Sequence, residues 1–285
     1  MSFIIPIILS GIENIGLPFV IYKNEDFTIQ ISEFPITERE ELFDIKIHEV
    51  REATTKYTRR IHNVSDHIDK FSEFISSKYK IFIITKDNSK ELIAKFSPYC
   101  FNLDFCCQLY FKYPITLTFF GETKYSTTQH SMQSYAKKSD KIILNLENLE
   151  SFKKTFELCI GNIIDKKKKH MLASLINVTC LQTFNPGLIC STYVTILESL
   201  FANENTEVTY RFALRLTKYL KKDHDFFKRI KVFYQKRSTY YHTGEIKFSY
   251  DDEKYLSALS RQLIIDFLQN PGNFDTVNLD KLLLS

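Results

Sequence analysis

Apolar residues in the second half of the chain repeat at the spacing of an α-helix. In the segment 249–270 they recur every three or four positions, which places them on one face of a helix. Ser249, with Asp252 three residues later, is typical of a capped helix start, and Asn270-Pro271-Gly272 is typical of a stop. The residues expected on the buried face are Leu256, Leu259, Leu263, Ile264 and Phe267.

The same periodicity predicts further helices upstream of this one. They are Leu149–Ile164, Met171–Phe184, Ile189–Phe201, Thr206–Leu220 and Asp225–Tyr241. Asn185-Pro186-Gly187 is expected to separate two of them. The basic run Lys166–Lys169 is expected to be a solvated linker. Short connections between such helices favour an antiparallel bundle.

The first half of the chain has a different pattern, with many short runs rich in β-branched and aromatic residues. The expected strands are Phe3–Leu9, Phe19–Tyr22, Phe27–Ile31, Ile81–Thr85, Cys100–Tyr110, Ile115–Phe120 and Ile142–Leu146. The residues from Lys23 to Asp26 form a turn signal, and the polar segment Thr37–Ser77 is expected to be helical. We therefore predict an α+β chain, with a mixed, strand-rich domain over residues 1–148 and an all-α helical bundle over 149–285.

Composition excludes several classes of protein. The chain has only seven glycines and no glycine-rich phosphate loop, which disfavours a Rossmann or P-loop nucleotide site. None of the six cysteines forms a CxxC pair, so a zinc ribbon is not expected. Cys159, Cys180 and Cys190 lie in apolar segments and are expected to be small buried side chains in a reducing compartment. The sequence thus predicts a cytoplasmic protein without metal, cofactor or membrane partner.

One charge interrupts the apolar pattern of the segment 225–241. The apolar residues at helical spacing there are Phe226, Ile230, Phe233, Tyr234 and Tyr241. Arg237 falls on the same stripe, within about 20° of its centre. Because an unpaired guanidinium is costly to bury, and because His242 and Gly244 follow as at a helix end, we interpret this place as a functional site.

Positive charge gathers around this site. From Ser151 onward there are twenty basic and fourteen acidic residues, although the whole chain has a net charge of only +4. Between Lys221 and Arg237 there are seven basic and two acidic residues. A polyanion such as RNA fits this distribution. A solvated basic face is the structural alternative.

Arg237 and His242 form an R-x4-H motif. Three further segments accompany this motif in the sequence. In chain order they are Leu197–Leu200, which contains Glu198, then Tyr210–Leu214, and, after the motif, the closing amphipathic helix. Over Ser191–Gln269 the chain resembles the HEPN superfamily of prokaryotic ribonucleases, and within it the ApeA-like HEPN domains of bacterial defence proteins. It departs from the common pattern in having Ser238 where many members have asparagine, and Thr243 between the histidine and the glycine.

The resemblance implies a HEPN-like helical fold and a metal-independent endoribonuclease of an antiviral defence or toxin system. Arg237 would bind the scissile phosphate, with Ser238 as a supporting donor. His242 would be the general acid or base, since the ordinary pKa of histidine is about 6.5. Cleavage would leave a 2′,3′-cyclic phosphate. Glu198 would steady Arg237, and a homodimer would bring two motifs to one cleft.

Further contacts to RNA are expected from Lys231 and Lys236 through charge, and from Tyr240 and Tyr241 through base stacking. Tyrosines at such positions are more often packing residues of a core or an interface. The alternative for Arg237 is a buried ion pair that holds the bundle together. Two other functions stay open: a non-catalytic HEPN module that binds RNA or dimerises, and a helical scaffold without a nucleic-acid role. The N-terminal domain is expected to sense a trigger or to recruit a protein or small-molecule partner.

Overall fold

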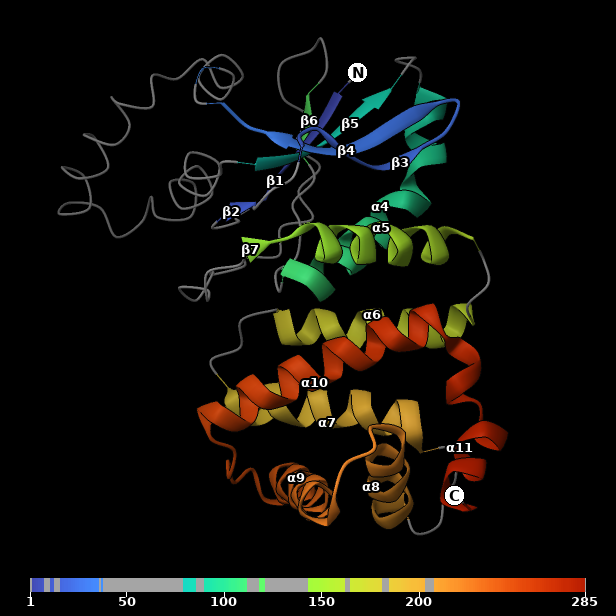
Figure 1. Ribbon diagram of the computed structural model, residues 1–285. Coiled ribbons are helices and arrows are strands. Elements are labelled where there is room, and N and C mark those ends of the chain that lie inside the picture. The colour runs from blue at the N-terminus through green and yellow to red at the C-terminus, as the bar shows by residue number, and fades with distance from the viewer. Residues whose placement is uncertain are drawn as a thin grey trace, which may run out of the picture. The chain divides into compact units, whose positions relative to one another are not determined.

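The computed structural model describes residues 2–7, 11–12, 16–35, 37, 79–85, 90–111, 118–120, 143–161, 165–180, 185–202 and 208–284. The chain divides into two compact units, and Figure 1 shows their elements. The second unit holds the helices from residue 166 onward. It also takes in the chain from Tyr99 to Pro114 and from Lys154 onward. The two units therefore alternate along the sequence, and the boundary at residue 148 stays a prediction.

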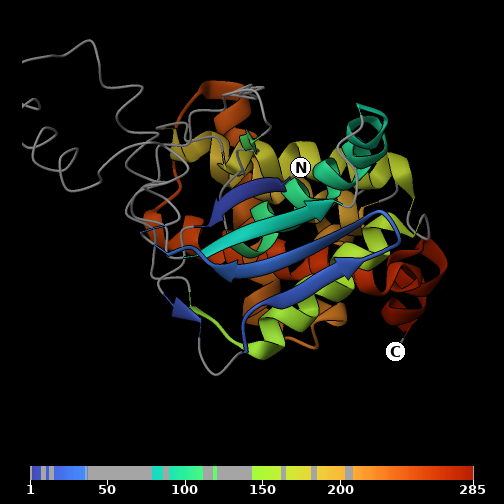
Figure 2. The same cartoon turned by 90° about the horizontal axis from the view of Figure 1, so that it is seen from above.

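The first unit contains a five-stranded sheet of order β3-β4-β5-β1-β6, in which all the paired neighbours are antiparallel (Figure 2). Its strands are β1 (Ser2–Ile7), β3 (Phe19–Lys23), β4 (Phe27–Glu33), β5 (Tyr79–Thr85) and β6 (Thr118–Phe120). Ile81 of β5 lies opposite Ile31 of β4 and Ile5 of β1. Two further strands, β2 (Gly11–Ile12) and β7 (Ile143–Leu144), form a parallel pair.

Local sequence explains the best-defined hairpin of this sheet. The Asn24 side chain accepts hydrogen bonds from the backbone N–H groups of Asp26 (2.9 Å) and Phe27 (2.8 Å), which closes the predicted turn between β3 and β4. Along β4, Phe27, Ile29 and Ile31 are buried while the residues between them are half-buried. This alternation confirms the predicted strand.

The predicted strand Cys100–Tyr110 is wrong, because these residues lie in helix α4 (Lys90–Phe111). From residue 102 to 109 all but one of the side chains are buried. A helix covered on nearly all sides carries no polar stripe, and a short apolar run of this kind cannot be told from a strand by periodicity. The predicted strand Ile142–Leu146 is confirmed in part: β7 covers Ile143–Leu144, and helix α5 (Leu146–Ile160) begins at the last residue of the run. The expected helix at 37–77 lies outside the described residues apart from Thr37.

The second unit is helical. Its remaining elements are α6 (Lys166–Cys180), α7 (Pro186–Phe201), α8 (Val208–Tyr219), α9 (His224–Thr243), α10 (Tyr250–Gln269), the 3₁₀ turn η1 (Pro271–Phe274) and α11 (Thr276–Leu284). Helix α7 packs against α6, α8, α9 and α10, and Figure 1 shows α8 and α9 side by side next to it. It is apolar over most of its surface and forms the core of the unit. Helix α11 was not predicted.

The helix starts follow local capping rules. Ser249 and Asp252 form the predicted capping box of α10, which is therefore confirmed. Asn185 is the N-cap of α7. The break predicted at Asn185-Pro186-Gly187 is therefore the start of this helix, and Pro186 and Gly187 belong to its first turn. The linker expected at Lys166–Lys169 is wrong, since Asp165 accepts a hydrogen bond from the Lys167 N–H (2.9 Å) at the start of α6. No helix in the described part combines the length and apolar character needed to cross a bilayer.

Candidate active site on helices α7 and α9

Helix α9 carries the R-x4-H motif near its C-terminal end. It starts at the N-cap Asp223 and ends at Gly244, whose φ of 73° gives the left-handed turn that glycine adopts without strain. Phe227, Ile230 and Phe233 form its buried face. Arg237 comes one turn after Phe233 on this face, as the sequence predicted.

The guanidinium of Arg237 is held by two side chains of α7. Its Nε donates to Thr195 Oγ1 (3.1 Å), and its Nη1 lies 3.0 Å from Glu198 Oε2. Only 21% of the Arg237 side chain and 20% of the Glu198 side chain are exposed. The guanidinium also lies 5.5 Å from the ring centres of Tyr234 and Tyr241. The arginine therefore has a fixed position at the edge of the core.

Arg237 keeps some binding capacity in this arrangement. A guanidinium has five N–H donors, and the contacts above use Nε and Nη1. Within the described part of the chain, Nη2 has no hydrogen-bond partner. A phosphate oxygen can therefore bind to this side of the fork while Glu198 holds the other.

His242 lies apart from Arg237. It is exposed, in the last turn of α9. Five residues along a regular helix correspond to about 140° of rotation, so the two side chains leave the helix in different directions. Among the described residues His242 has no hydrogen bond and no ring contact. Ser238 is half-buried next to Arg237. One copy of the chain thus brings Arg237 to Glu198 and does not bring it to His242.

The two tyrosines of the motif differ in their surroundings. Tyr241 is 55% exposed, whereas Tyr240 packs against the first turn of α7. The Tyr240 hydroxyl accepts a hydrogen bond from Asn185 Nδ2 (3.0 Å), and its ring lies close to Gly187. Tyr241 is therefore the better placed of the two for stacking on a base.

The lysines expected to bind RNA also differ. The Lys236 ammonium lies 2.6 Å from Asp252, so its charge is already paired. Burial alone would raise the pKa of Asp252, but hydrogen bonds from Lys236 and Ser249 outweigh it and hold that pKa below its ordinary value. Lys231 is half-buried, 5.5 Å from the ring centre of Phe227. Lys221 and Lys228 are exposed.

Sequence reasoning missed three residues that shape this site. Thr195 precedes Glu198 by three positions, so helical spacing could have placed both on the face of α7 toward Arg237. Asn185 before a proline is a recognisable helix N-cap. Nothing in the sequence pairs Gly187 with Tyr240, because that contact is set by how closely α7 and α9 approach.

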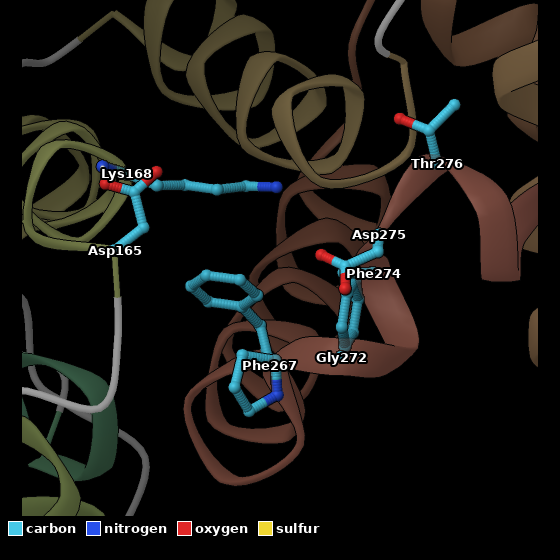
Figure 3. Close-up of a pocket in the computed structure, with 8 residues that line it drawn as sticks. Asp165, Lys168, Phe267, Gly272, Phe274, Asp275 and Thr276 are labelled. Atoms are coloured by element: carbon cyan, nitrogen blue, oxygen red, sulfur yellow. Dashed lines mark hydrogen bonds between the residues drawn. The ribbon is translucent and has the colours of Figure 1, made fainter.

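A separate pocket of roughly 450 Å³ lies beside η1. Figure 3 shows the Lys168 side chain extending toward Phe267 and Asp275. The Lys168 ammonium is 5.0 Å from the Phe267 ring centre, and burial lowers its pKa although Asp165 and Asp275 act against this. None of the lining residues belongs to α9, and the sequence did not predict this pocket. Its walls are formed by Asp165, Lys168, Phe267, Pro271, Gly272, Phe274, Asp275 and Thr276.

Comparison with known proteins places the chain in no family. Neither a family model, nor a curated protein, nor a solved structure matches it. In the described residues no three His, Cys, Asp or Glu side chains are grouped as metal ligands.

Proposed function

We propose that the helical unit is a metal-independent endoribonuclease of the HEPN type, acting in a bacterial antiviral defence or toxin system. The observation that carries the proposal is the Arg237 fork, which α7 holds in place through Thr195 and Glu198 while Nη2 has no hydrogen-bond partner among the described residues. His242 follows five residues later on the same helix, exposed to solvent and pointing in a different direction. These are the two groups that RNA cleavage needs, since RNA carries its own nucleophile.

The chemistry assigns a role to each group. The 2′-hydroxyl attacks the adjacent phosphorus, and the 5′-oxygen leaves, which produces a 2′,3′-cyclic phosphate. His242 removes the proton from the 2′-hydroxyl or gives one to the leaving oxygen. Arg237 binds the non-bridging oxygens, where negative charge accumulates in the transition state. Glu198 positions Arg237, and Ser238 is a supporting donor.

The proposal requires two copies of the chain. Because Arg237 and His242 leave α9 about 140° apart, we infer that a phosphate on Arg237 meets the histidine of a second copy. A two-fold axis along the ends of the two α9 helices would bring both motifs to one cleft, in which the Arg237 of each copy is paired with the His242 of the other. The N-terminal unit would then control this assembly in response to a trigger.

The first test is cleavage of total RNA by purified protein in the presence of EDTA. His242→Ala should reduce the rate by about 10² to 10⁴, and the products of the unaltered protein should end in 2′,3′-cyclic phosphates. His224→Ala is the matched control, since His224 is an exposed histidine at the opposite end of the same helix. Equal cleavage by the His242 variant would contradict the proposal.

A second candidate is a non-catalytic module that binds RNA or dimerises. The ion pair to Glu198 favours it, because it neutralises part of the charge that a catalytic arginine offers to phosphate. In this case the protein would retain RNA in a salt-dependent manner. No cleaved ends would form, and His242→Ala would bind as the unaltered protein does.

A further inference from the structure

The pocket beside η1 contains a lysine ammonium without a polar partner among the described residues. Lys168 is half-buried, and its side chain extends toward Phe267 and Asp275 (Figure 3). The ammonium lies 5.0 Å from the Phe267 ring centre, and within the described ranges it forms no hydrogen bond and no ion pair. Because an ammonium has three N–H donors, this one is available to an anionic group of a ligand.

Two carboxylates line the same pocket. The charges of Asp165 and Asp275 both act on the Lys168 ammonium, although neither residue forms an ion pair with it. Asp165 uses one carboxylate oxygen to accept the backbone N–H of Lys167 (2.9 Å). The Asp275 side chain accepts no hydrogen bond from the part of the chain that the structure describes. Asp165 and Asp275 are both exposed, so the pocket is open to solvent and offers acceptors for a cationic group.

Aromatic rings form the apolar part of the pocket wall. Phe267 and Phe274 are buried, and their ring centres lie 5.5 Å apart. Phe274 also contacts Phe201 of α7 and Tyr219 of α8. Because the core fixes these rings, the pocket exists without a ligand. Its volume of roughly 450 Å³ lies within the range of about 300–1,000 Å³ that is usual for small-molecule sites.

We propose that this pocket binds a free α-amino acid with an apolar side chain. The carboxylate of the ligand pairs with the Lys168 ammonium, and the ammonium of the ligand pairs with Asp275. The ligand side chain lies against Phe267 and Pro271, which form part of the same wall. All the lining residues lie in the second compact unit. The site is independent of the proposed ribonuclease.

The charges on the pocket wall favour a zwitterion over a simple ion. A simple anion such as phosphate is attracted by Lys168 but repelled by the two carboxylates. A simple cation is attracted by the carboxylates but repelled by the ammonium that lies between α6 and α10. An α-amino acid carries both charges on neighbouring atoms, so each of its charged groups meets a group of opposite sign.

The first experiment measures the melting temperature of the purified full-length protein, and the heat of binding, with each of the twenty common amino acids. A ligand that binds only the folded protein raises the melting temperature. We expect leucine or phenylalanine to bind and to raise it. Glutamate and lysine should bind more weakly, because their additional charge would meet the aromatic part of the wall.

Two derivatives of phenylalanine test the two charges separately. N-acetylphenylalanine lacks the cation, and phenylalaninamide lacks the anion. The unaltered protein should bind each of them about tenfold or more weakly than phenylalanine. Lys168→Gln should no longer discriminate between phenylalanine and phenylalaninamide, but should still reject N-acetylphenylalanine. Asp275→Asn should show the reverse pattern. A general loss of structure would not produce this crossed result.

Lys167→Gln and Asp251→Asn are the matched controls, since both side chains are exposed and neither lines the pocket. They should bind phenylalanine as the unaltered protein does. The proposal is overturned if no amino acid binds at about 10 mM, or if inorganic phosphate or either derivative binds as tightly as phenylalanine. It is also overturned if Lys168→Gln, shown to be folded by circular dichroism, discriminates as the unaltered protein does. RNA cleavage is not part of the readout, so that failure here and failure of the proposed ribonuclease are distinguishable.

Discussion

Arg237 and Glu198 form an ion pair that is mostly covered by the surrounding side chains, with about one fifth of each exposed. Breaking such a pair costs more stability than breaking one on the surface, because removing one partner leaves the other charge unpaired and only partly hydrated. Glu198 also holds the guanidinium of Arg237 in position against α7. Stability and phosphate binding are therefore expected to change together when Glu198 is altered.

Glu198→Gln should lower the free energy of unfolding by about 1–3 kcal/mol, since the amide keeps the shape of the side chain but not its charge. Denaturant unfolding followed by circular dichroism measures this difference. Glu245→Gln is the control, because the Glu245–Lys247 pair is about half exposed and a change within about 0.5 kcal/mol is expected there. If the two variants lose the same stability, the charge of Glu198 is not what holds Arg237.

At the scale of the element, the crossing of α7 and α9 depends on the absence of a side chain at Gly187. A Cβ at this position would lie 2.6 Å from Cε2 of Tyr240 and 3.0 Å from Ile246 Cγ1. Real atoms do not approach so closely. The Tyr240 ring would have to move away from Asn185, and the last turns of α9 would move with it.

Gly187→Ala should therefore lower the free energy of unfolding by about 1–3 kcal/mol and weaken RNA cleavage or binding. Gly272→Ala is the matched control, because nothing lies within 4 Å of a Cβ added there. The double variant Gly187→Ala with Tyr240→Ala should lose less stability than the two single changes together. If the stability losses of the two single variants simply add in the double variant, the Tyr240 ring is not what clashes with a side chain at position 187.

The start of α10 gives a pH-dependent prediction. The pKa of Asp252 is lower in the folded protein than its ordinary value of about 3.9. Its stabilising effect is therefore complete above the unfolded pKa and is lost as the pH falls through the folded pKa. Asp252→Asn should lower the melting temperature at pH 7, and this difference should shrink below about pH 4. A difference that stays constant from pH 7 to pH 3 would contradict the role of the carboxylate charge.

The sequence was informative wherever a signal is local. Ser249 and Asp252 predicted the start of α10, and the alternation from Phe27 to Ile31 predicted a strand, because capping and pleating act between near neighbours. The sequence failed for Cys100–Tyr110, where burial on nearly all sides removes the periodicity. Within the site, the spacing of α9 and the resemblance indicated Arg237 and Glu198, whereas the partners of Tyr240 depend on the packing of two distant helices.

At the scale of the whole molecule, the proposed site is shared between two copies, and this can be tested by mixing inactive variants. Arg237→Ala and His242→Ala should each be inactive alone. Co-expression should restore roughly a quarter of the cleavage rate, since half of the dimers are mixed and each of these carries one complete site. Light scattering on the same samples gives the mass in solution. A monomer, or no recovery on mixing, would rule out a site built from two copies.

The amide of Asn185 is occupied at both of its ends. Its oxygen accepts the N–H of Leu188 (3.1 Å) at the start of α7, and its nitrogen donates to the Tyr240 hydroxyl (3.0 Å). Aspartate at this position would keep the acceptor that begins one helix and lose the donor that anchors the other. Asn185→Asp, which exchanges one nitrogen for an oxygen, would thus keep the cap at the start of α7 and remove the link from that cap to the end of α9.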